Sequence, residues 1–217
     1  MAEQSWREAA RTFNERAEEY DGWFTDSPIF AAELAALRAL GPLPSPACEV
    51  GLGPGHFAAA LGCSLGIDPA LAPLRKALAR GIPAVQGRGE FLPLGNASLC
   101  TVALIMTLCF IKEPIQVLLE CRRVIRPGGM LVLGFVPAAG PWGHMLTAKA
   151  LAGHPYYRHA RLLEVDEVEQ LLNKTGFVPQ DWRATLFQPP DELRSVETPR
   201  PVRDEQAGFL ALRALRN

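Results

Sequence analysis

One stretch decides the fold of this chain: EVGLGPG, residues 49–55. Ala47 and Cys48 lead into it as the apolar end of a short strand, and residues 56–61 read as the start of a helix. The glycines therefore lie on a turn from a strand into a helix, where α/β proteins commonly hold nucleotide-like ligands. Because glycine has no Cβ, the chain can turn sharply there and its backbone can approach a ligand.

The spacing of these glycines selects among ligands. A dinucleotide fingerprint would place its third glycine three residues after the second, but that position is His56 and the third glycine is Gly55. The spacing therefore disfavours a nicotinamide-dependent oxidoreductase. A tight turn that binds no ligand is the alternative for this stretch taken alone.

Strand and helix patterns alternate after the turn. Thr101–Met106 is a continuous apolar run, typical of a strand covered on both faces of a parallel sheet. The repeated units predict an α/β fold with a doubly wound sheet. After the first strand, further strands are expected at residues 64–68, 83–86, 101–106, 130–136, 177–187 and 206–212, and helices at 71–80, 114–125 and 165–175.

We expect one domain with four parts. An N-terminal helical cap covers residues 1–41, with helices at 3–20 and 28–40, and the cofactor-binding core covers 47–136. Residues 137–163, rich in Gly, Pro, His and aromatics, are expected to cover the site and to select the substrate. The last part, 164–217, holds a helix and two strands, and its proline-rich segment 189–205 reads as a surface connection.

Asp68 ends the second strand, thirteen residues after Gly55. A carboxylate at that edge of the sheet can accept hydrogen bonds from both hydroxyls of a ribose. The alternative is a helix-capping aspartate, because Pro69 follows and Asp-Pro often starts a helix.

Four motifs in this order resemble those of the class I S-adenosylmethionine-dependent methyltransferases. They are the glycine turn preceded by Glu49, the aspartate at position 68, the loop GRGEFLPL at 87–94 and the RPGG turn at 126–129. The resemblance implies a Rossmann-like, mostly parallel, seven-stranded sheet and S-adenosylmethionine as the cofactor. In such an enzyme the glycines Gly51, Gly53 and Gly55 would lie against the methyl donor.

The loop at 87–94 departs from the family pattern at one position. Where the family usually has an aspartate that accepts from the adenine amino group, this chain has Arg88, which offers no acceptor. The resemblance therefore assigns adenine to the backbone of Gly89 and Glu90, with the Glu90 side chain as a further acceptor. The apolar packing around adenine is expected from Pro69, Leu71 and Phe91.

A narrower resemblance points to small methyltransferases of type 11, related to those of quinone biosynthesis. It rests on residues 107–110, beginning at Thr107, on residues 149–169 and 207–209, and on the N-terminal Tyr20 and Trp23. In such relatives the N-terminal segment closes over the donor, so Tyr20, Trp23 and Thr107 are candidate donor contacts. Tyr20 and Trp23 read equally well as core aromatics.

Methyl transfer from a sulfonium needs alignment and exclusion of water more than it needs a catalytic side chain. The catalytic residue is therefore unknown from the sequence. His144, His154 and His159 lie in the expected cover, where one could accept a proton, although each also reads as a surface histidine. No His or Cys spacing predicts a metal site, and the five cysteines read as reduced core residues.

The composition of the chain limits the classes of molecule that it is expected to bind. The net charge of −1 provides no basic field for nucleic acid or an anionic membrane, and no run approaches the ~20 apolar residues of a membrane span. We expect a cytoplasmic enzyme that acts on a small molecule, with no nucleic-acid or membrane partner. The rival interpretation is a catalytically silent module that binds S-adenosylmethionine or S-adenosylhomocysteine. Oligomeric state and acceptor are not specified by the sequence.

Overall fold

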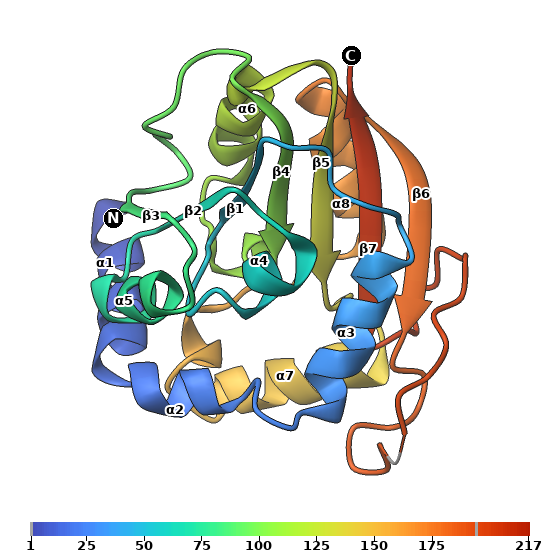
Figure 1. The fold of residues 1–217 in the computed structure, drawn as a ribbon. Helices are drawn as coiled ribbons and strands as arrows, with labels where there is room; N and C mark the ends of the chain where they lie inside the picture. The colour runs from blue at the N-terminus through green and yellow to red at the C-terminus, as the bar shows by residue number, and fades with distance from the viewer. Residues whose placement is uncertain (1, 194) are drawn as a thin grey trace.

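The structure, a computed structural model, describes residues 2–193 and 195–217. Position 1 of the expected cap and position 194 of the expected surface connection lie outside the described residues. Seven strands form one sheet in the order β3-β2-β1-β4-β5-β7-β6, which Figure 1 shows running across the molecule. The strands are β1 Ala47–Val50, β2 Leu65–Asp68, β3 Ala84–Gln86, β4 Leu99–Ile105, β5 Ile125–Phe135, β6 Phe177–Thr185 and β7 Phe209–Arg216.

The sheet is mixed. The five strands β1 to β5 pair parallel with one another, while β7 runs antiparallel to both β5 and β6. The order reverses after β3, so the sheet grows in opposite directions from β1 and β4. In open α/β sheets of this kind ligands bind outside the carboxyl ends of the strands at that switch point. The doubly wound α/β prediction is confirmed.

Helices cover both faces and the lower edge of the sheet. Figure 1 shows α2, α7 and α3 in a row beneath the ends toward which β4 and β5 point. The α-helices are α1 Ala2–Glu15, α2 Ala17–Gly22, α3 Pro28–Arg38, α4 His56–Leu61, α5 Leu71–Ala79, α6 Pro114–Val124, α7 Pro141–Leu151 and α8 Val165–Lys174, and the short 3-10 helices are η1 Leu108–Phe110 and η2 Tyr157–His159.

Two hydrophobic layers hold the sheet. One contains Val117 and Leu118 of α6 and Leu172 of α8 against β4 and β5, and the other packs Leu37 of α3 and Trp142 of α7 against the opposite face. Burial of such apolar surface supplies most of the folding free energy, at about 25 cal/mol per Å². No helix among residues 2–193 and 195–217 is both long and apolar enough to cross a membrane.

Local signals set most element boundaries. Ser27 begins α3 by accepting a hydrogen bond at 3.2 Å from the Phe30 backbone N–H, as Ser27-Pro28 predicts. The expected helix 3–20 is instead two helices, because Arg16 leaves helical geometry with φ −120° and ψ 28°. That break sets α2 at an angle to α1, beside the glycine turn.

The expected turn at residues 126–129 is also different. β5 begins at Ile125, which pairs with Leu99, and the ladder resumes with Met130 opposite Thr101. The four residues between form a bulge opposite Cys100 rather than a turn before the strand. Gly129 is required there, since an added Cβ would lie 2.7 Å from the Cys100 carbonyl oxygen.

Candidate active site

The glycine turn connects β1 to α4 at the carboxyl edge of the sheet. Gly51 and Gly53 have φ angles of +80° and +52°, which L side chains adopt rarely. A Cβ at Gly53 would lie 3.1 Å from Cε1 of Tyr20, and one at Gly51 would collide with the Thr107 side chain. Both positions therefore need glycine for conformation and for space.

Asp68 lies beside the turn at the end of β2 and is 9% exposed. Its Oδ2 accepts the Gly53 backbone N–H at 2.8 Å, and its Oδ1 accepts that of Ala70 at 2.7 Å. Burial raises the pKa of Asp68 to about 6, although both backbone hydrogen bonds act to lower it. The Ala70 bond closes a local turn ahead of α5, whose N-cap is Ala70 itself and is not capped by a side chain. Each carboxylate oxygen keeps lone pairs for a ligand in the adjoining cavity.

A cavity of about 520 Å³, called here the donor cavity, opens beside Asp68. It brings together most of the side chains and glycines that the sequence proposes for the cofactor, drawn from α2, three strand ends and the loop after β3. These are Tyr20, Gly51, Gly53, Asp68, Pro69, Gly89, Glu90, Phe91 and Thr107.

The remaining four proposed cofactor residues lie elsewhere. Trp23 and Glu49 line a second cavity, described below, and Gly55 and Leu71 line neither of the two. Gly55 has φ +83°, and a Cβ there would meet Cβ of Ala77 at 2.9 Å, so it allows α4 and α5 to pack closely. Leu71 is 41% exposed, outside the cavity wall.

Arg88, the departure from the family pattern, forms part of the donor cavity wall. Its guanidinium lies 4.7 Å from the ring centroid of Trp6 and 5.6 Å from that of Phe91, and it pairs with Glu90 at 3.4 Å. Cation–π contact of this kind holds side chains from distant segments together. Arg88 thus connects α1 to the loop after β3.

Two further residues line the donor cavity that the sequence did not indicate as site residues: Trp6 and Phe13, both from α1. Their helical spacing with Ala9 and Ala10, which also line it, was the available signal. An amphipathic pattern predicts that one face of a helix is buried, but it does not say against what. Here part of the apolar face of α1 lines the donor cavity.

A second cavity of about 470 Å³, called here the acceptor cavity, adjoins the first. The two share lining residues at the ends of β1 and β4, on the N-terminal helices and on η1: Phe13, Tyr20, Gly51, Ile105, Met106 and Phe110. Met106 takes a left-handed φ of +53° directly after β4. Such strained residues often occur at functional sites.

Two buried carboxyl groups line the acceptor cavity. Glu33 of α3 is 8% exposed, and burial raises its pKa to about 8. Glu49 of β1 is 2% exposed, its Oε2 has no hydrogen-bond partner among the described residues, and burial also raises its pKa. An unpaired buried carboxylate is costly, so both positions favour a cationic or hydrogen-bonding ligand.

Of the three candidate histidines, only His154 lines either cavity. Burial lowers its pKa, and its buried Nδ1 has no partner among the described residues. His144 is exposed on α7, and His159 is engaged with Thr12, whose Oγ1 lies 3.2 Å from its Nε2. Of the three histidines, His154 is therefore the one that lies in the wall of a cavity.

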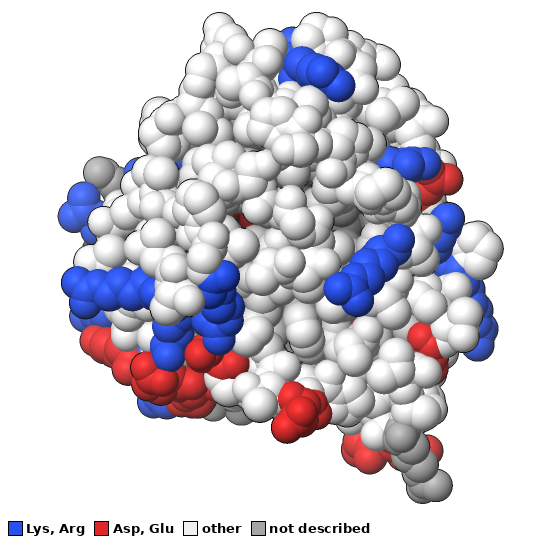
Figure 2. Space-filling view, viewed as in Figure 1, with Lys and Arg blue, Asp and Glu red and all other residues white. Residues whose placement is uncertain are grey.

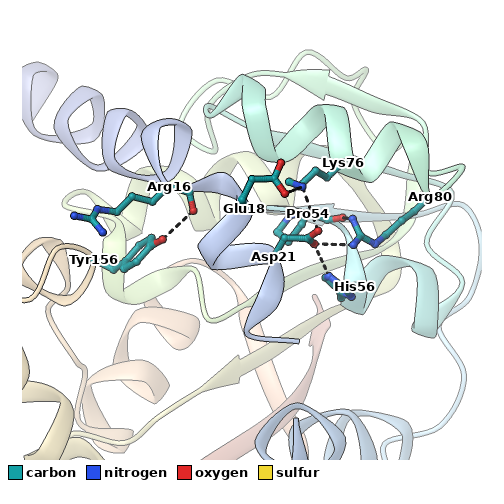
Figure 3. Close-up of polar contacts among 8 residues, drawn as sticks. All are labelled: Arg16, Glu18, Asp21, Pro54, His56, Lys76, Arg80 and Tyr156. Carbon is teal, nitrogen blue, oxygen red and sulfur yellow. Dashed lines mark hydrogen bonds and ion pairs between the residues drawn. The ribbon is translucent and has the colours of Figure 1, made fainter. Parts of the chain in front are cut away.

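Polar contacts attach the N-terminal helices to the glycine turn (Figure 3). Asp21 of α2 lies 2.7 Å from both His56 Nε2 and Arg80 Nη2, and 3.4 Å from Lys76 Nζ. Arg80 also donates to the Pro54 carbonyl oxygen at 3.0 Å. This Asp21 cluster fixes α2, and with it Tyr20, over Gly53. Figure 2 shows charges of both signs gathered at the lower left of the surface, where Figure 1 places α2 and α5.

No group of His, Cys, Asp and Glu side chains among residues 2–193 and 195–217 is arranged to hold a metal ion. Cys48, Cys63, Cys100 and Cys121 are buried free thiols, and Cys109 is half-buried.

Comparison with known proteins agrees with this geometry. Residues 48–133 match a family model described as a methyltransferase domain. An uncharacterised protein of Mycobacterium tuberculosis is 38% identical over 201 residues, covering 90% of this chain and 70% of the relative. The malonyl-[acyl-carrier protein] O-methyltransferase of Methylococcus capsulatus is 31% identical over 156 residues, covering 66% of this chain and 56% of that enzyme.

Among solved structures, a S-adenosylmethionine-dependent methyltransferase of Thermotoga maritima, described as a possible histamine N-methyltransferase, superimposes with a TM-score of 0.88. It is 28% identical, and the match covers 95% of this chain and 99% of that one. The family model and the Methylococcus capsulatus relative agree on methyl transfer, and the Thermotoga maritima structure adds S-adenosylmethionine as the methyl donor. This chain belongs to the class I S-adenosylmethionine-dependent methyltransferases.

Proposed function

We propose that the protein transfers a methyl group from S-adenosylmethionine in the donor cavity to a small molecule in the acceptor cavity. The observation that carries this proposal is the shared wall of the two cavities, which includes Tyr20, Gly51 and Met106. A methyl group can pass between two ligands without entering water only where their sites meet. The wall shared by the two cavities lies beside the glycine turn, at the switch point of the sheet.

The residues of the donor cavity fit the donor. Asp68 would accept hydrogen bonds from the ribose hydroxyls, and the backbone of Gly89 and Glu90 would face adenine, with Pro69 and Phe91 packing against the ring. Glu49 lines the adjoining acceptor cavity and is close to Gly51 in the chain, and its unpartnered Oε2 suits the cationic amino group of the methionine portion where the two cavities meet. Tyr20, held over Gly53, would cover the same portion.

The donor supplies an activated methyl group on a positively charged sulfur. The protein then has to align the acceptor with the methyl–sulfur bond and exclude water. Three aromatic rings line the wall shared by the two cavities: Phe13, Tyr20 and Phe110. The ring centroid of Phe13 lies 4.9 Å from that of Tyr20 and 5.3 Å from that of Phe110. Packing at this distance leaves little room for water around the reacting atoms.

The names of the relatives leave the acceptor atom open. The Thermotoga maritima protein is described as a possible N-methyltransferase and the Methylococcus capsulatus enzyme as an O-methyltransferase. The acceptor of this chain therefore has to be inferred from its own cavity. A small molecule is supported by the cavity volume of about 470 Å³ and by its largely aromatic lining.

Calorimetry and product analysis test the proposal. S-adenosylhomocysteine is expected to bind in a one-to-one ratio, and NAD is not. With S-adenosylmethionine and a panel of small amines, phenols, alcohols and thiols, mass spectrometry should show one methyl group on an acceptor and one S-adenosylhomocysteine formed for each. Binding of S-adenosylhomocysteine with no transfer to any panel member would favour the silent module instead.

A further inference from the structure

The acceptor cavity combines aromatic rings with a buried carboxyl group. Tyr20 lies 5.4 Å from both Trp23 and Phe24 between ring centroids, and Trp23 stacks on Tyr157 at 6.1 Å. Phe24 packs edge-on against Phe30 at 5.4 Å. A ligand in this cavity would face the π surfaces of several rings. Such surfaces attract organic cations.

Glu33 is one of the two buried carboxyl groups that line this cavity with the rings. It projects from an apolar stretch of α3, between Ala32 and Leu34, and is more than nine-tenths buried. The described part of the chain provides it with no hydrogen-bond or ion-pair partner. Burial alone accounts for the raised pKa of Glu33. The pKa of Tyr157 is raised to about 12 by burial first and by the nearby Glu33 carboxylate second, which places the two side chains within electrostatic reach of each other.

An unpaired carboxyl group in such surroundings makes folding less favourable by several kcal/mol when it ionises. A hydrophobic residue would fill the same space without that cost. The position is therefore explained better by a ligand than by packing. A ligand that carries a positive charge and an apolar body would satisfy the carboxylate and the rings together.

We propose that the methyl acceptor is a small amine with an apolar or aromatic body, bound as its ammonium ion by Glu33 within the aromatic acceptor cavity. The proposal rests on the methyl-transfer function proposed above and names its substrate class. It assigns to Glu33 two tasks: recognition of the cation and acceptance of its proton.

The chemistry balances with these groups alone. The ammonium ion gives one proton to the Glu33 carboxylate, which leaves a neutral amine with a free lone pair. That lone pair forms a bond to the methyl carbon as the carbon–sulfur bond breaks, and the bonding electrons remain on sulfur. The products are a methylated ammonium ion and S-adenosylhomocysteine. The Glu33 proton is then released to solvent.

Other titratable groups also surround the cavity. Glu49 is assigned to the donor, His56 is engaged with Asp21, and Lys149 is exposed at the rim. A positive rim lysine would repel an ammonium ion slightly, or pair with an acidic group elsewhere on the acceptor. The full set that lines the cavity is Tyr20, Glu33, Glu49, His56, Lys149, His154, Tyr156 and Tyr157.

Binding of matched probes provides the test. In the presence of saturating S-adenosylhomocysteine, 2-phenylethylamine is expected to bind at least tenfold more tightly than 2-phenylethanol, which has the same shape and no charge. Glu33→Gln should reduce this preference to about one, because the amide pairs poorly with a cation. The matched control Glu164→Gln, at an exposed glutamate before α8, should leave the preference unchanged.

Proton release gives a second readout that a packing role would not produce. Because the pKa of Glu33 is about 8, the carboxyl is mostly protonated at pH 6.5 in the free protein. Binding of an ammonium ion must then expel close to one proton, which calorimetry in two buffers of different ionisation enthalpy measures. At pH 9.5 the release should disappear and give way to a small proton uptake, because Glu33 is then ionised and part of the free amine is neutral before it binds. The Glu33→Gln variant should release none at pH 6.5.

The outcomes separate this inference from the function on which it rests. Failure of S-adenosylhomocysteine to bind the wild-type protein would remove the methyltransferase proposal itself. If it binds, and 2-phenylethanol or phenylacetate binds as well as the amine, the amine inference alone is overturned. An amine preference that persists in a folded Glu33→Gln variant, shown by an unchanged affinity for S-adenosylhomocysteine, would overturn the role of Glu33.

Discussion

The two cavities are built in different ways. The donor cavity is formed largely by residues 50–116, where successive strands end at the same edge of the sheet, with one wall from α1. The acceptor cavity is formed largely by residues 20–33, the glycine turn, the end of β4 with η1, and residues 149–157, which lie far apart in the chain. A site at adjacent strand ends is determined by a short repeated pattern. A site between distant helices depends on how the whole chain packs.

The largest effect is expected from Gly53→Val, which places a β-branched side chain at φ +52° and against Tyr20. S-adenosylhomocysteine binding should be lost in calorimetry, since the backbone can no longer approach the ligand. Gly62→Val is the matched control: it has a similar φ of +73° but open space around its Cβ. It should lose stability from backbone strain, of about 1–2 kcal/mol, and still bind.

Asp68→Asn tests the donor cavity without a large change of shape. Loss of charge-assisted hydrogen bonds costs about 1.5–3 kcal/mol, so affinity for S-adenosylhomocysteine should fall roughly tenfold or more. The carboxylate has to be ionised for those bonds, and its pKa is about 6, so wild-type affinity should fall as pH drops below that value. The variant should show a flatter pH profile.

Asp204→Asn is a suitable control for Asp68→Asn. Asp204 also accepts a backbone N–H two residues ahead, that of Gln206, at 2.9 Å, and it lines neither cavity. Its replacement should leave donor affinity and its pH profile at the wild-type level. Equal losses in the two variants would mean that Asp68 acts through its local turn and not through the ligand.

Glu33→Gln tests the acceptor cavity through the pH dependence of the protein's stability. The pKa of Glu33 is about 8 in the folded protein against 4.5 for a free side chain. A group with a raised folded pKa contributes its stability below the unfolded value and loses it as pH rises through the folded value. Wild type and variant should therefore melt at similar temperatures at pH 4.5, and the variant should melt several degrees higher at pH 9.

Glu164→Gln again serves as the control for that measurement, because its side chain is exposed and lines neither cavity. A melting temperature of Glu33→Gln that stays parallel to wild type from pH 4.5 to 9 would show that Glu33 ionises normally, and the two cavities would then differ less than the structure indicates.

The smallest effect is expected from Asp21→Asn, which weakens the Asp21 cluster that connects α2 to the glycine turn. Partly exposed ion pairs contribute about 0.2–1 kcal/mol each, so donor affinity should fall only a few-fold as Tyr20 loses its support. Burial opposes ionisation of Asp21, but hydrogen bonds from His56 and Arg80 hold its pKa below the usual value. This support should therefore persist above pH 4 and decline in stronger acid.

Asp181→Asn provides the comparison for Asp21→Asn, since Asp181 pairs with Arg213 across β6 and β7, far along the sheet from the donor cavity. Its loss should change the melting temperature by a similar amount and leave S-adenosylhomocysteine affinity unchanged. A weaker donor affinity in both variants would show that general destabilisation, and not the position of α2, lowers binding.

The sequence by itself determined the fold, the donor and most of the donor cavity. Glycine spacing, apolar strands and a carboxylate after β2 are short-range patterns, and parallel strands bring their carboxyl ends together whatever the loops do. Local patterns did not determine which nearby residues line the cavity, because that depends on packing. Gly55 and Leu71 lie near the right turn and helix, but they face another helix and solvent.

Only the tertiary structure revealed the acceptor cavity and Glu33. Its carboxyl shares the cavity with rings from the neighbouring residues 20–30 and with rings from residues 154–157, which are more than a hundred residues away in the chain. No local pattern records that second proximity. A lone glutamate in the apolar stretch of α3 was the available signal, yet it has meaning only when burial removes its water and provides no partner. The quinone-related subgroup, read from local motifs, stays a prediction.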